Sequence, residues 1–491
     1  MSEPDDPNRR ASEAADLLES ILEDRGVLAD LEPEVRKRLL IAAGRVARPT
    51  GADRSKLKKA QLRKEKVAQR EEQRDLLSRT QIRKLRENPI FLTPRHAGPE
   101  SAPVPEVLPE PLGETAEARP CYCCRKRFRE VHFFYDQMCR ECGDFNFRKR
   151  TPAGDLTGRV ALVTGARVKI GFQAAVMLLR AGCRVLVTTR FPRDAARRYA
   201  ELEDFADWSD RLEIHGIDLR QVPAVEALCA HLLARLDRLD FIVNNACQTV
   251  RRPPGFYDHL MDGERAHDAL PDDCRELLAP STGPMSAPEL SQVALLPEDA
   301  QRTTGQGSTA RALFPAGVLD ADLQQVDLRE VNSWRLQLDQ VPTVELLEVQ
   351  LVNAVAPFIL NARLKPLMKR VPTNDKQIVN VSAMEGQFYR IFKSDRHPHT
   401  NMAKAALNML TRTSAMDYID DGIHMNSVDT GWVTDEDPVH HVERKQAEHD
   451  FHPPLDIVDG AARIVDPIFE GVRTGTFVYG QFLKDYVPTD W

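Results

Sequence analysis

The sequence predicts an α/β protein with a doubly wound parallel sheet, preceded by a small metal-binding module and an α-helical N-terminal arm. Three observations support this prediction. From about residue 155 onward short β-branched strands alternate with amphipathic helices, a glycine-rich turn follows the first of these strands, and five of the nine cysteines lie within residues 121–142. Alternating strands and helices are typical of a parallel sheet that is covered by helices on both faces.

Composition limits the kind of protein. The chain has 491 residues, of which 42% are hydrophobic, enough for two or three domains with one large core. The formal net charge of -7 makes nucleic acid an unfavourable partner for the whole molecule. The acidic start MSEPDDPNRR has no apolar stretch, and nowhere do about 18 apolar residues follow one another. We therefore expect no signal peptide and no membrane span, and a cytoplasmic protein with reduced cysteines.

The N-terminal third of the chain is expected to be elongated and polar. Residues 1–50 carry apolar positions at helical spacing on both sides of LADLEPE, which predicts a helical arm. Residues 51–118 combine a charged helix, with the run KLKKAQLRKEK, and a linker rich in proline and acidic residues. The charged helix is either a solvated tether or a docking surface for an acidic partner or nucleic acid.

Residues 119–150 are predicted to form a zinc-binding module. Cys121 and Cys124 form one CxxC pair and Cys139 and Cys142 form another. Two such pairs supply four thiolates for a closed tetrahedral zinc site. The alternative is redox-active or merely buried cysteine. We expect the module to fold only with its metal and to dock on the neighbouring domain or on a partner.

Residues 157–189 read as a strand, a turn, a helix and a second strand. Gly165 and Gly171 lie in the turn, where phosphates approach a helix N-terminus. Further strands are expected at LEIHGIDL, which contains Asp218, and at LDFIVNNAC, KQIVNVSA and GIHMNSVDTGWVT. This order is typical of a Rossmann-like dinucleotide-binding fold.

These residues resemble the short-chain dehydrogenase/reductase family over residues 153–491, with an insertion at about 249–340. The specific marks are TGxxxxIG, NNA, the strand IVNVS and Lys404. The resemblance implies hydride transfer between a nicotinamide cofactor and a carbonyl or alcohol. It also implies a homodimer that pairs through the helices expected at 343–370 and 400–419.

The cofactor is expected to be NADP(H), with NAD(H) as the alternative. Thr189 ends the second strand where an NAD-preferring member carries an acid, and Arg190 follows, so that Arg190 with Arg193 or Lys169 can bind a 2′-phosphate. Lys169 replaces the family's second glycine and can offer its ammonium to phosphate. The predicted cofactor-binding residues are Gly165, Arg167, Lys169, Ile170, Gly171, Arg190, Asp218, Asn245, Lys404, Gly431 and Thr434.

The catalytic residues depart from the family pattern. The family's tyrosine lies four residues before the lysine, and here that position is Thr400, whose aliphatic hydroxyl has too high a pKa for proton transfer. The serine position is Ala383, with Ser382 one place early. Asn353 and Lys404 match the two remaining members of the family's catalytic tetrad. The candidate catalytic residues are Lys404, Asn353, Thr400, Ser382 and Tyr389.

Two accounts of the missing tyrosine remain open, and with them whether the protein is an enzyme. In the first, Tyr389 or a histidine of the segment EGQFYRIFKSDRHPH takes its place. In the second, the domain binds a nucleotide as a catalytically silent sensor or scaffold that acts through its zinc module and arm.

The insertion begins with QTVRRPPGFYDHL, directly after a strand, at the edge of the sheet where ligands bind. A lid that brings Arg251 and Arg252 to the cofactor suggests an anionic or bulky small-molecule substrate, or a partner protein's loop. The alternative is a surface excursion unrelated to ligand.

Overall fold

The computed structural model describes residues 6–87, 107–266, 270–280, 286–300, 312–315, 317–318, 325–389 and 393–491. The chain divides into two compact units, Met1–Gln73 and Arg74–Trp491, and the division falls within helix α3 (Gly51–Ser78). Each unit is described by itself.

The first unit is helical, as predicted. It contains α1 (Pro7–Glu23), a 3-10 turn η1 (Arg25–Leu28), α2 (Pro33–Ala47) and most of α3. The carboxylates of Asp6 and Asp24 cap the first two elements by accepting backbone N–H bonds. Within residues 6–73, Ile21 is the one buried hydrophobic side chain, so this unit has almost no core of its own.

The second unit is built around an eight-stranded sheet with the order β10-β9-β8-β7-β6-β3-β4-β5. All neighbouring strands are parallel except β9 and β10, which are antiparallel. The strands are β3 (Val160–Thr164), β4 (Arg184–Thr189), β5 (Leu212–Gly216), β6 (Phe241–Asn244), β7 (Lys376–Ser382), β8 (Ile423–Asp429), β9 (Phe482–Lys484) and β10 (Val487–Thr489). The predicted doubly wound parallel sheet is confirmed, and the antiparallel β10 is an addition.

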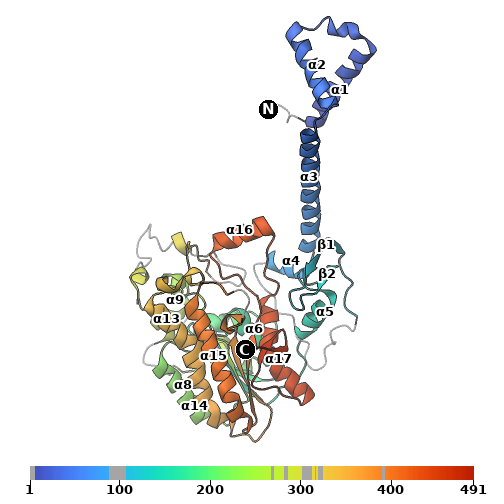
Figure 1. Ribbon diagram of the computed structural model, residues 1–491. Helices are drawn as coiled ribbons and strands as arrows, with labels where there is room; N and C mark the ends of the chain where they lie inside the picture. The colour runs from blue at the N-terminus through green and yellow to red at the C-terminus, as the bar shows by residue number, and fades with distance from the viewer. Residues whose placement is uncertain are drawn as a thin grey trace. The chain divides into compact units, whose positions relative to one another are not determined.

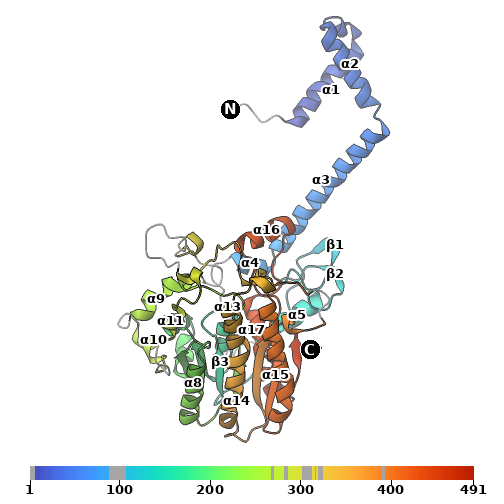
Figure 2. The same ribbon diagram turned by 60° about the vertical axis from the view of Figure 1, so that its left-hand side comes forward.

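Helices cover both faces of the sheet because its side chains alternate between two cores. Ala161 and Val163 of β3 face one core, and Leu162 faces the other. The first face carries α6 (Lys169–Arg180), α7 (Pro192–Ala200) and α17 (Ile457–Thr474). The second face carries α8 (Val222–Arg235), α13 (Thr343–Gln350), the π-helical segment η9 (Leu351–Val355), α14 (Ala356–Met368) and α15 (Pro398–Ile419), of which α8, α14 and α15 stand side by side in Figure 2.

One continuous helical stretch, Thr343–Met368, is long and apolar enough to cross a membrane by length and composition, and it is the one such stretch among the described residues. In this fold it packs on the sheet and on α8, with Leu360 and Leu364 fully buried. Packing in a core of this kind requires the same apolar composition.

The cysteine-rich segment shares the core of the sheet. It comprises the hairpin β1 (Glu114–Pro120) and β2 (Arg127–Glu130) and helix α5 (Arg140–Lys149). Phe134, Tyr135 and Met138 belong to the same hydrophobic cluster as the residues of α6 and α17. α5 and α17 lie next to each other in Figure 1. The module is therefore part of the second compact unit rather than an independent domain.

The insertion is packed against the sheet edge. Its described helices are η4 (Pro254–Tyr257), α9 (Asp258–Arg265), α10 (Asp272–Glu276), α11 (Ala287–Ser291), η6 (Pro297–Ala300), η7 (Ser333–Arg335) and η8 (Leu338–Gln340). Leu278 forms a parallel bridge with Ile214 of β5, and Phe256, Tyr257 and Leu260 form a small apolar core with Phe191. The described part of the insertion is therefore packed on the sheet edge and on Phe191, and its role toward a ligand stays a prediction.

Candidate functional site

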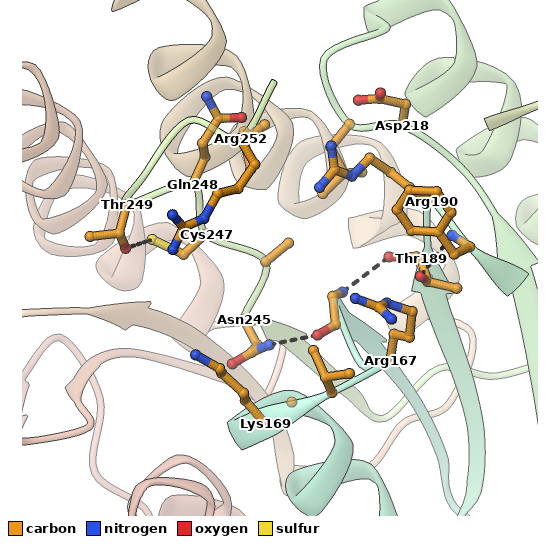
Figure 3. A pocket seen from close by; sticks show the side chains of 18 of the residues that line it. Arg167, Lys169, Thr189, Arg190, Asp218, Asn245, Cys247, Gln248, Thr249 and Arg252 are labelled. Carbon is orange, nitrogen blue, oxygen red and sulfur yellow. Dashed lines mark hydrogen bonds between the residues drawn. The ribbon is translucent and has the colours of Figure 1, made fainter. Parts of the chain in front are cut away.

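A cavity of about 330 Å³ opens at the carboxyl ends of β3, β4, β5 and β6 (Figure 3). The turns after these four strands supply most of its lining. Eight of the predicted cofactor-binding residues lie in this lining, namely Gly165, Arg167, Lys169, Ile170, Gly171, Arg190, Asp218 and Asn245. The carboxyl edge of an open parallel sheet is where ligands bind in such folds.

The glycine-rich turn is tightly packed. A Cβ on Gly165, whose φ is +68°, would lie 2.8 Å from the Cα of Ala246. A Cβ on Gly171 would lie 2.2 Å from the amide nitrogen of Asn245. That amide donates hydrogen bonds of 3.0 and 3.1 Å to the carbonyls of Thr164 and Gly165. Asn245 therefore ties the turn after β6 to the turn after β3, as Figure 3 shows.

Lys169 begins α6 with a φ of +56°, the left-handed conformation that glycine adopts freely. A side chain in this conformation costs about 1–2 kcal/mol. The backbone at Lys169 thus has the conformation that a glycine at this position would adopt freely. Burial opposes ionisation of Glu436, but Lys169, Arg252 and a hydrogen bond from Thr434 outweigh it and lower the pKa of Glu436. Both Lys169 and Glu436 line the cavity.

Arg190 is held by a tyrosine of the insertion. Its Nη2 donates a 2.6 Å hydrogen bond to the hydroxyl of Tyr257, and its guanidinium lies 4.6 Å from the centre of that ring. No carboxylate is hydrogen-bonded to Arg190 within the described ranges. Arg167 pairs with Asp194 at 2.6 Å. Arg190, Arg167 and Tyr257 all line the cavity, which leaves the Arg190 guanidinium available to an anionic ligand.

Other predicted residues take different roles. Arg193 does not line the cavity, and its backbone N–H donates to Glu264. Asp218 is buried and pairs with Arg220 at 2.6 Å. Burial opposes ionisation of Asp218, but the hydrogen bonds and the charge of Arg220 outweigh it, so the pKa of Asp218 is lowered. The Asp218 carboxylate is therefore ionised at the cavity wall, with a guanidinium beside it.

Lys404 and Asn353 are both buried. The Lys404 ammonium donates a 2.8 Å hydrogen bond to the carbonyl of Val381. Asn353 lies in the π-helical segment η9 and exchanges hydrogen bonds of 2.8 and 3.2 Å with the backbone of Gln248, which lines the cavity. Asn353 is therefore anchored to the backbone of a cavity residue, whereas Lys404, a predicted cofactor-binding residue, is bonded to Val381 of β7 and does not line the cavity.

The replaced tetrad positions carry unpartnered hydroxyls. Thr400 and Ser382 are 2% and 3% exposed, and neither hydroxyl has a hydrogen-bond partner among the described residues. Tyr389 is 92% exposed on the segment after β7 and does not line the cavity. The structure therefore does not bring Tyr389 to the buried Thr400 and Ser382, and its catalytic role stays a prediction.

A histidine lies one turn before Thr400. Thr400 and Lys404 fall on one face of α15, because they are four residues apart, whereas His397 directly precedes the helix and has a left-handed backbone with a φ of +43°. The His397 ring stacks on Trp334 of the insertion at 3.9 Å between ring centres, and its Nδ1 is buried without a partner in the described part of the chain. Burial lowers the pKa of His397. The nearby His399 bonds to Glu345 through Nε2 at 3.2 Å.

Gly431 and Thr434 lie in the segment after β8 and do not line the cavity. The Thr434 hydroxyl donates a 2.8 Å hydrogen bond to Glu436, which does line it. Thr434 is thus one side chain removed from the space where a ligand would sit.

The four predicted zinc ligands form one cluster. The sulfur atoms of Cys121, Cys124, Cys139 and Cys142 lie within 4.8 Å of one another, and those of Cys124 and Cys139 are 3.8 Å apart. Zinc–sulfur bonds of about 2.3 Å in a tetrahedron require sulfur separations of about 3.8 Å. The residues therefore fit a zinc ion. His132 is occupied elsewhere, since its Nδ1 accepts the backbone N–H groups of Phe134 and Tyr135.

The sequence prediction missed several cavity residues, chiefly Arg220, Glu348 and Glu436. Of the two arginines expected to reach the cofactor from the insertion, Arg252 lines the cavity, whereas Arg251 does not and pairs with Asp299 and Glu348. Glu436 has no local signal in the sequence, because only the fold brings it to Lys169.

Comparison with known proteins places the chain in a family. The sequence profile described as short chain dehydrogenase matches residues 159–260, and the one described as Enoyl-(Acyl carrier protein) reductase matches residues 336–453. An uncharacterized protein of Acanthamoeba polyphaga mimivirus is 30% identical over 369 residues, which cover 72% of this chain and 71% of that protein. The chain belongs to the short-chain dehydrogenase/reductase family, a family of NAD(P)-dependent oxidoreductases.

Named reductases match over a shorter part. The fatty acyl-CoA reductase of Acinetobacter baylyi is 31% identical over 112 residues, covering 23% of this chain and 37% of that enzyme. The (-)-isopiperitenone reductase of Mentha piperita is 34% identical over 89 residues, covering 18% and 28%. Among solved structures, the Pseudomonas aeruginosa RhlG/NADP active-site complex is 19% identical and covers 68% of this chain and 96% of that one, with a TM-score of 0.44.

Proposed function

We propose that this protein is an NADP(H)-dependent oxidoreductase that transfers hydride between nicotinamide and a carbonyl or alcohol, with a proton donor other than tyrosine. The observation that carries the proposal is Arg190 at the end of β4, which lines the cavity and is bonded to Tyr257 instead of a carboxylate.

The cavity suits the phosphates of NADP(H). Thr189 carries no charge that could meet the ribose. Its hydroxyl accepts the backbone N–H of Phe191. Arg190 can then bind a 2′-phosphate with its remaining N–H groups. Lys169 sits at the N-terminus of α6, where backbone N–H groups favour the pyrophosphate. When bound, the cofactor supplies or accepts the hydride.

Reduction of a carbonyl also places a proton on the oxygen, and we assign this proton to His397. Its Nδ1 is buried without a hydrogen-bond partner in the described chain, and the residue directly precedes α15, the helix that carries Thr400 and Lys404. The stack on Trp334 fixes the orientation of the ring. Lys404 and Asn353 would hold the ribose and relay protons, as the family resemblance implies.

A second candidate function is a nucleotide-binding sensor without turnover. It is favoured by the unpartnered hydroxyls of Thr400 and Ser382 and by the bond from Lys404 to a backbone carbonyl. In that case Lys404 serves only to hold ribose, and the nucleotide state is passed on through the cysteine module and the arm.

We also propose a homodimer. Helices α14 and α15 expose large apolar side chains, although the opposite sides of both helices are buried on the sheet. These side chains are Phe358 at 57%, Met402 at 54%, Met409 at 57% and Met416 at 65% exposure. A patch of this kind is typical of an interaction surface. We propose that a second copy of the chain covers this patch.

The test is a calorimetric titration of the zinc-loaded protein with NADPH and NADH, run beside an absorbance assay over a panel of carbonyl compounds. Arg190→Ala should weaken NADPH binding at least about tenfold and leave NADH unchanged. Arg184→Ala is the matched control, because Arg184 begins the strand that Arg190 follows, is exposed, and pairs with Glu213 away from the cavity. Tighter binding of NADH would overturn the assignment of the cofactor, and binding without turnover would favour the sensor.

A further inference from the structure

We propose that Tyr122 of the cysteine module positions residues 430–438 at the cofactor cavity, so that metal binding at the four cysteines sets the affinity for nucleotide. The inference rests on the proposed function for its ligand, and it adds a positioning residue and a coupling between two sites.

Residues 430–456 connect β8 with α17 and contain α16 (Val439–His449). This connection places Glu436 in the cavity wall and Thr434 beside it. The Asn332 side chain holds the same stretch from the insertion by donating to the Glu436 carbonyl at 2.8 Å. The position of residues 430–438 therefore decides how the cavity is closed next to Lys169.

Tyr122 lies between two predicted zinc ligands, Cys121 and Cys124. The backbone N–H of Trp432 donates a 2.9 Å hydrogen bond to the Tyr122 hydroxyl. The preceding residue, Gly431, has a φ of +75°, and a Cβ there would lie 3.1 Å from the same hydroxyl. The phenol thus supports the turn from which residues 432–438 start.

The far end of the connection is held by the residues that precede β3. Arg86 of α4 (Gln81–Glu87) donates to the carbonyls of Pro453 at 2.9 Å and Leu455 at 2.6 Å. Gln137 of the cysteine module donates to the His452 carbonyl at 2.6 Å. Arg83 forms a 2.8 Å ion pair with Asp450 at the C-terminal end of α16. Figures 1 and 2 both show α4 near α16.

These anchors differ in how they depend on the metal. Helix α5 is tied to α17 by ion pairs of Arg150 with Asp456 and Asp459, at 2.8 and 2.9 Å, which need no metal. The turn that carries Tyr122 has a 2.8 Å backbone hydrogen bond from Tyr122 to Gln137, but it also carries two of the four thiolates, so without the ion it loses the constraint that holds Cys121 and Cys124 together. Metal loss should therefore release Tyr122 and residues 430–438 while α5 and α17 stay packed.

Tyr122→Phe tests the position of the hydroxyl without changing the ring or the ligands. Hydrogen–deuterium exchange of residues 430–438 should become faster, while zinc content and the exchange of α17 stay as in the wild type. NADPH should bind about 3–10-fold more weakly, the usual effect of one lost hydrogen bond. Tyr479→Phe is the matched control, because Tyr479 is an exposed tyrosine outside the module. A zinc-loaded Tyr122→Phe protein with unchanged exchange and affinity would overturn the proposal.

Removing zinc from the full-length protein with a chelator gives an independent result. We expect faster exchange at 430–438 and weaker NADPH binding, both restored by adding zinc back. Unchanged exchange at 430–438 after zinc loss would refute the coupling. If the wild-type protein bound no NADPH at all, the proposed function would fail, whereas the exchange measurements would still decide whether Tyr122 positions these residues.

Discussion

Arg190 and Tyr257 are joined by a 2.6 Å hydrogen bond although 67 positions separate them in the chain. Arg190 directly follows strand β4, and Tyr257 belongs to the insertion. Burial opposes ionisation of Tyr257, but the charges of Arg190 and Arg252 outweigh it, so the pKa of Tyr257 is lowered. The insertion is therefore part of the wall that would receive a 2′-phosphate.

Tyr257→Phe should reduce selectivity for NADPH. Loss of the hydroxyl frees Arg190 to change rotamer, so we expect about fivefold weaker NADPH binding, corresponding to about 1 kcal/mol for one hydrogen bond. NADH binding should not change, because NADH lacks the phosphate that Arg190 contacts. Calorimetry with both nucleotides measures the ratio, and an equal loss for both would indicate a packing role instead.

His397→Gln should abolish proton donation but not cofactor binding. We expect kcat to fall by about 10²–10⁴, the usual contribution of a general acid, with NADPH affinity unchanged. In the wild type, reduction should slow as pH rises through the pKa of His397, which burial places below its ordinary value of 6.5. His440→Gln is the control, since His440 is exposed on α16. Equal turnover of wild type and His397→Gln would rule out this donor.

Thr400→Val should stabilise the protein. The Thr400 hydroxyl is buried without a partner in the described structure, and valine has nearly the same shape without the polar group. We expect the free energy of unfolding to rise by about 1 kcal/mol. Denaturant titration measures this change. A loss of stability would mean that the hydroxyl has a partner in solution.

Asp429→Asn should remove a pH-dependent loss of stability. Burial raises the pKa of Asp429 from 3.8 to about 6, so the folded state holds this proton more tightly than the unfolded state. The protonated Asp429 contributes to the free energy of unfolding, and this contribution is fully present below pH 3.8 and is lost as pH rises through 6. The stability of the asparagine variant relative to wild type should therefore increase by up to about 3 kcal/mol between pH 4 and pH 7. A constant difference over this range would contradict the shift.

Met409→Glu should separate the proposed dimer. A carboxylate at the centre of the exposed face of α15 would be buried without a partner, so the dimer should weaken at least about tenfold. Light scattering after size exclusion reports the mass. Leu338→Glu, at a 76% exposed position in the insertion, should have no effect. A monomeric wild-type protein would refute the dimer.

Local patterns in the sequence predicted the strands, the glycine-rich turn and the four-cysteine cluster, because each depends on residues close together in the chain. The shape of the turn persisted at Lys169, although a lysine stands where glycine was expected. The approach of Glu436 to Lys169 and of Tyr257 to Arg190 depends on tertiary packing. Docking of the cysteine module on the neighbouring domain was one of the two expected outcomes, but that α17 completes its core depends on tertiary packing.

The ion pair between Arg150 and Asp456 also has a consequence for biosynthesis. Its two partners are 306 positions apart in the chain. At about 5–20 residues per second, a ribosome needs about 15–60 s to make the intervening segment. During that interval the cysteine module has left the ribosome without the helix that covers it. Zinc is then the early constraint available to this segment, and metal supply during translation should govern the yield of correctly folded protein.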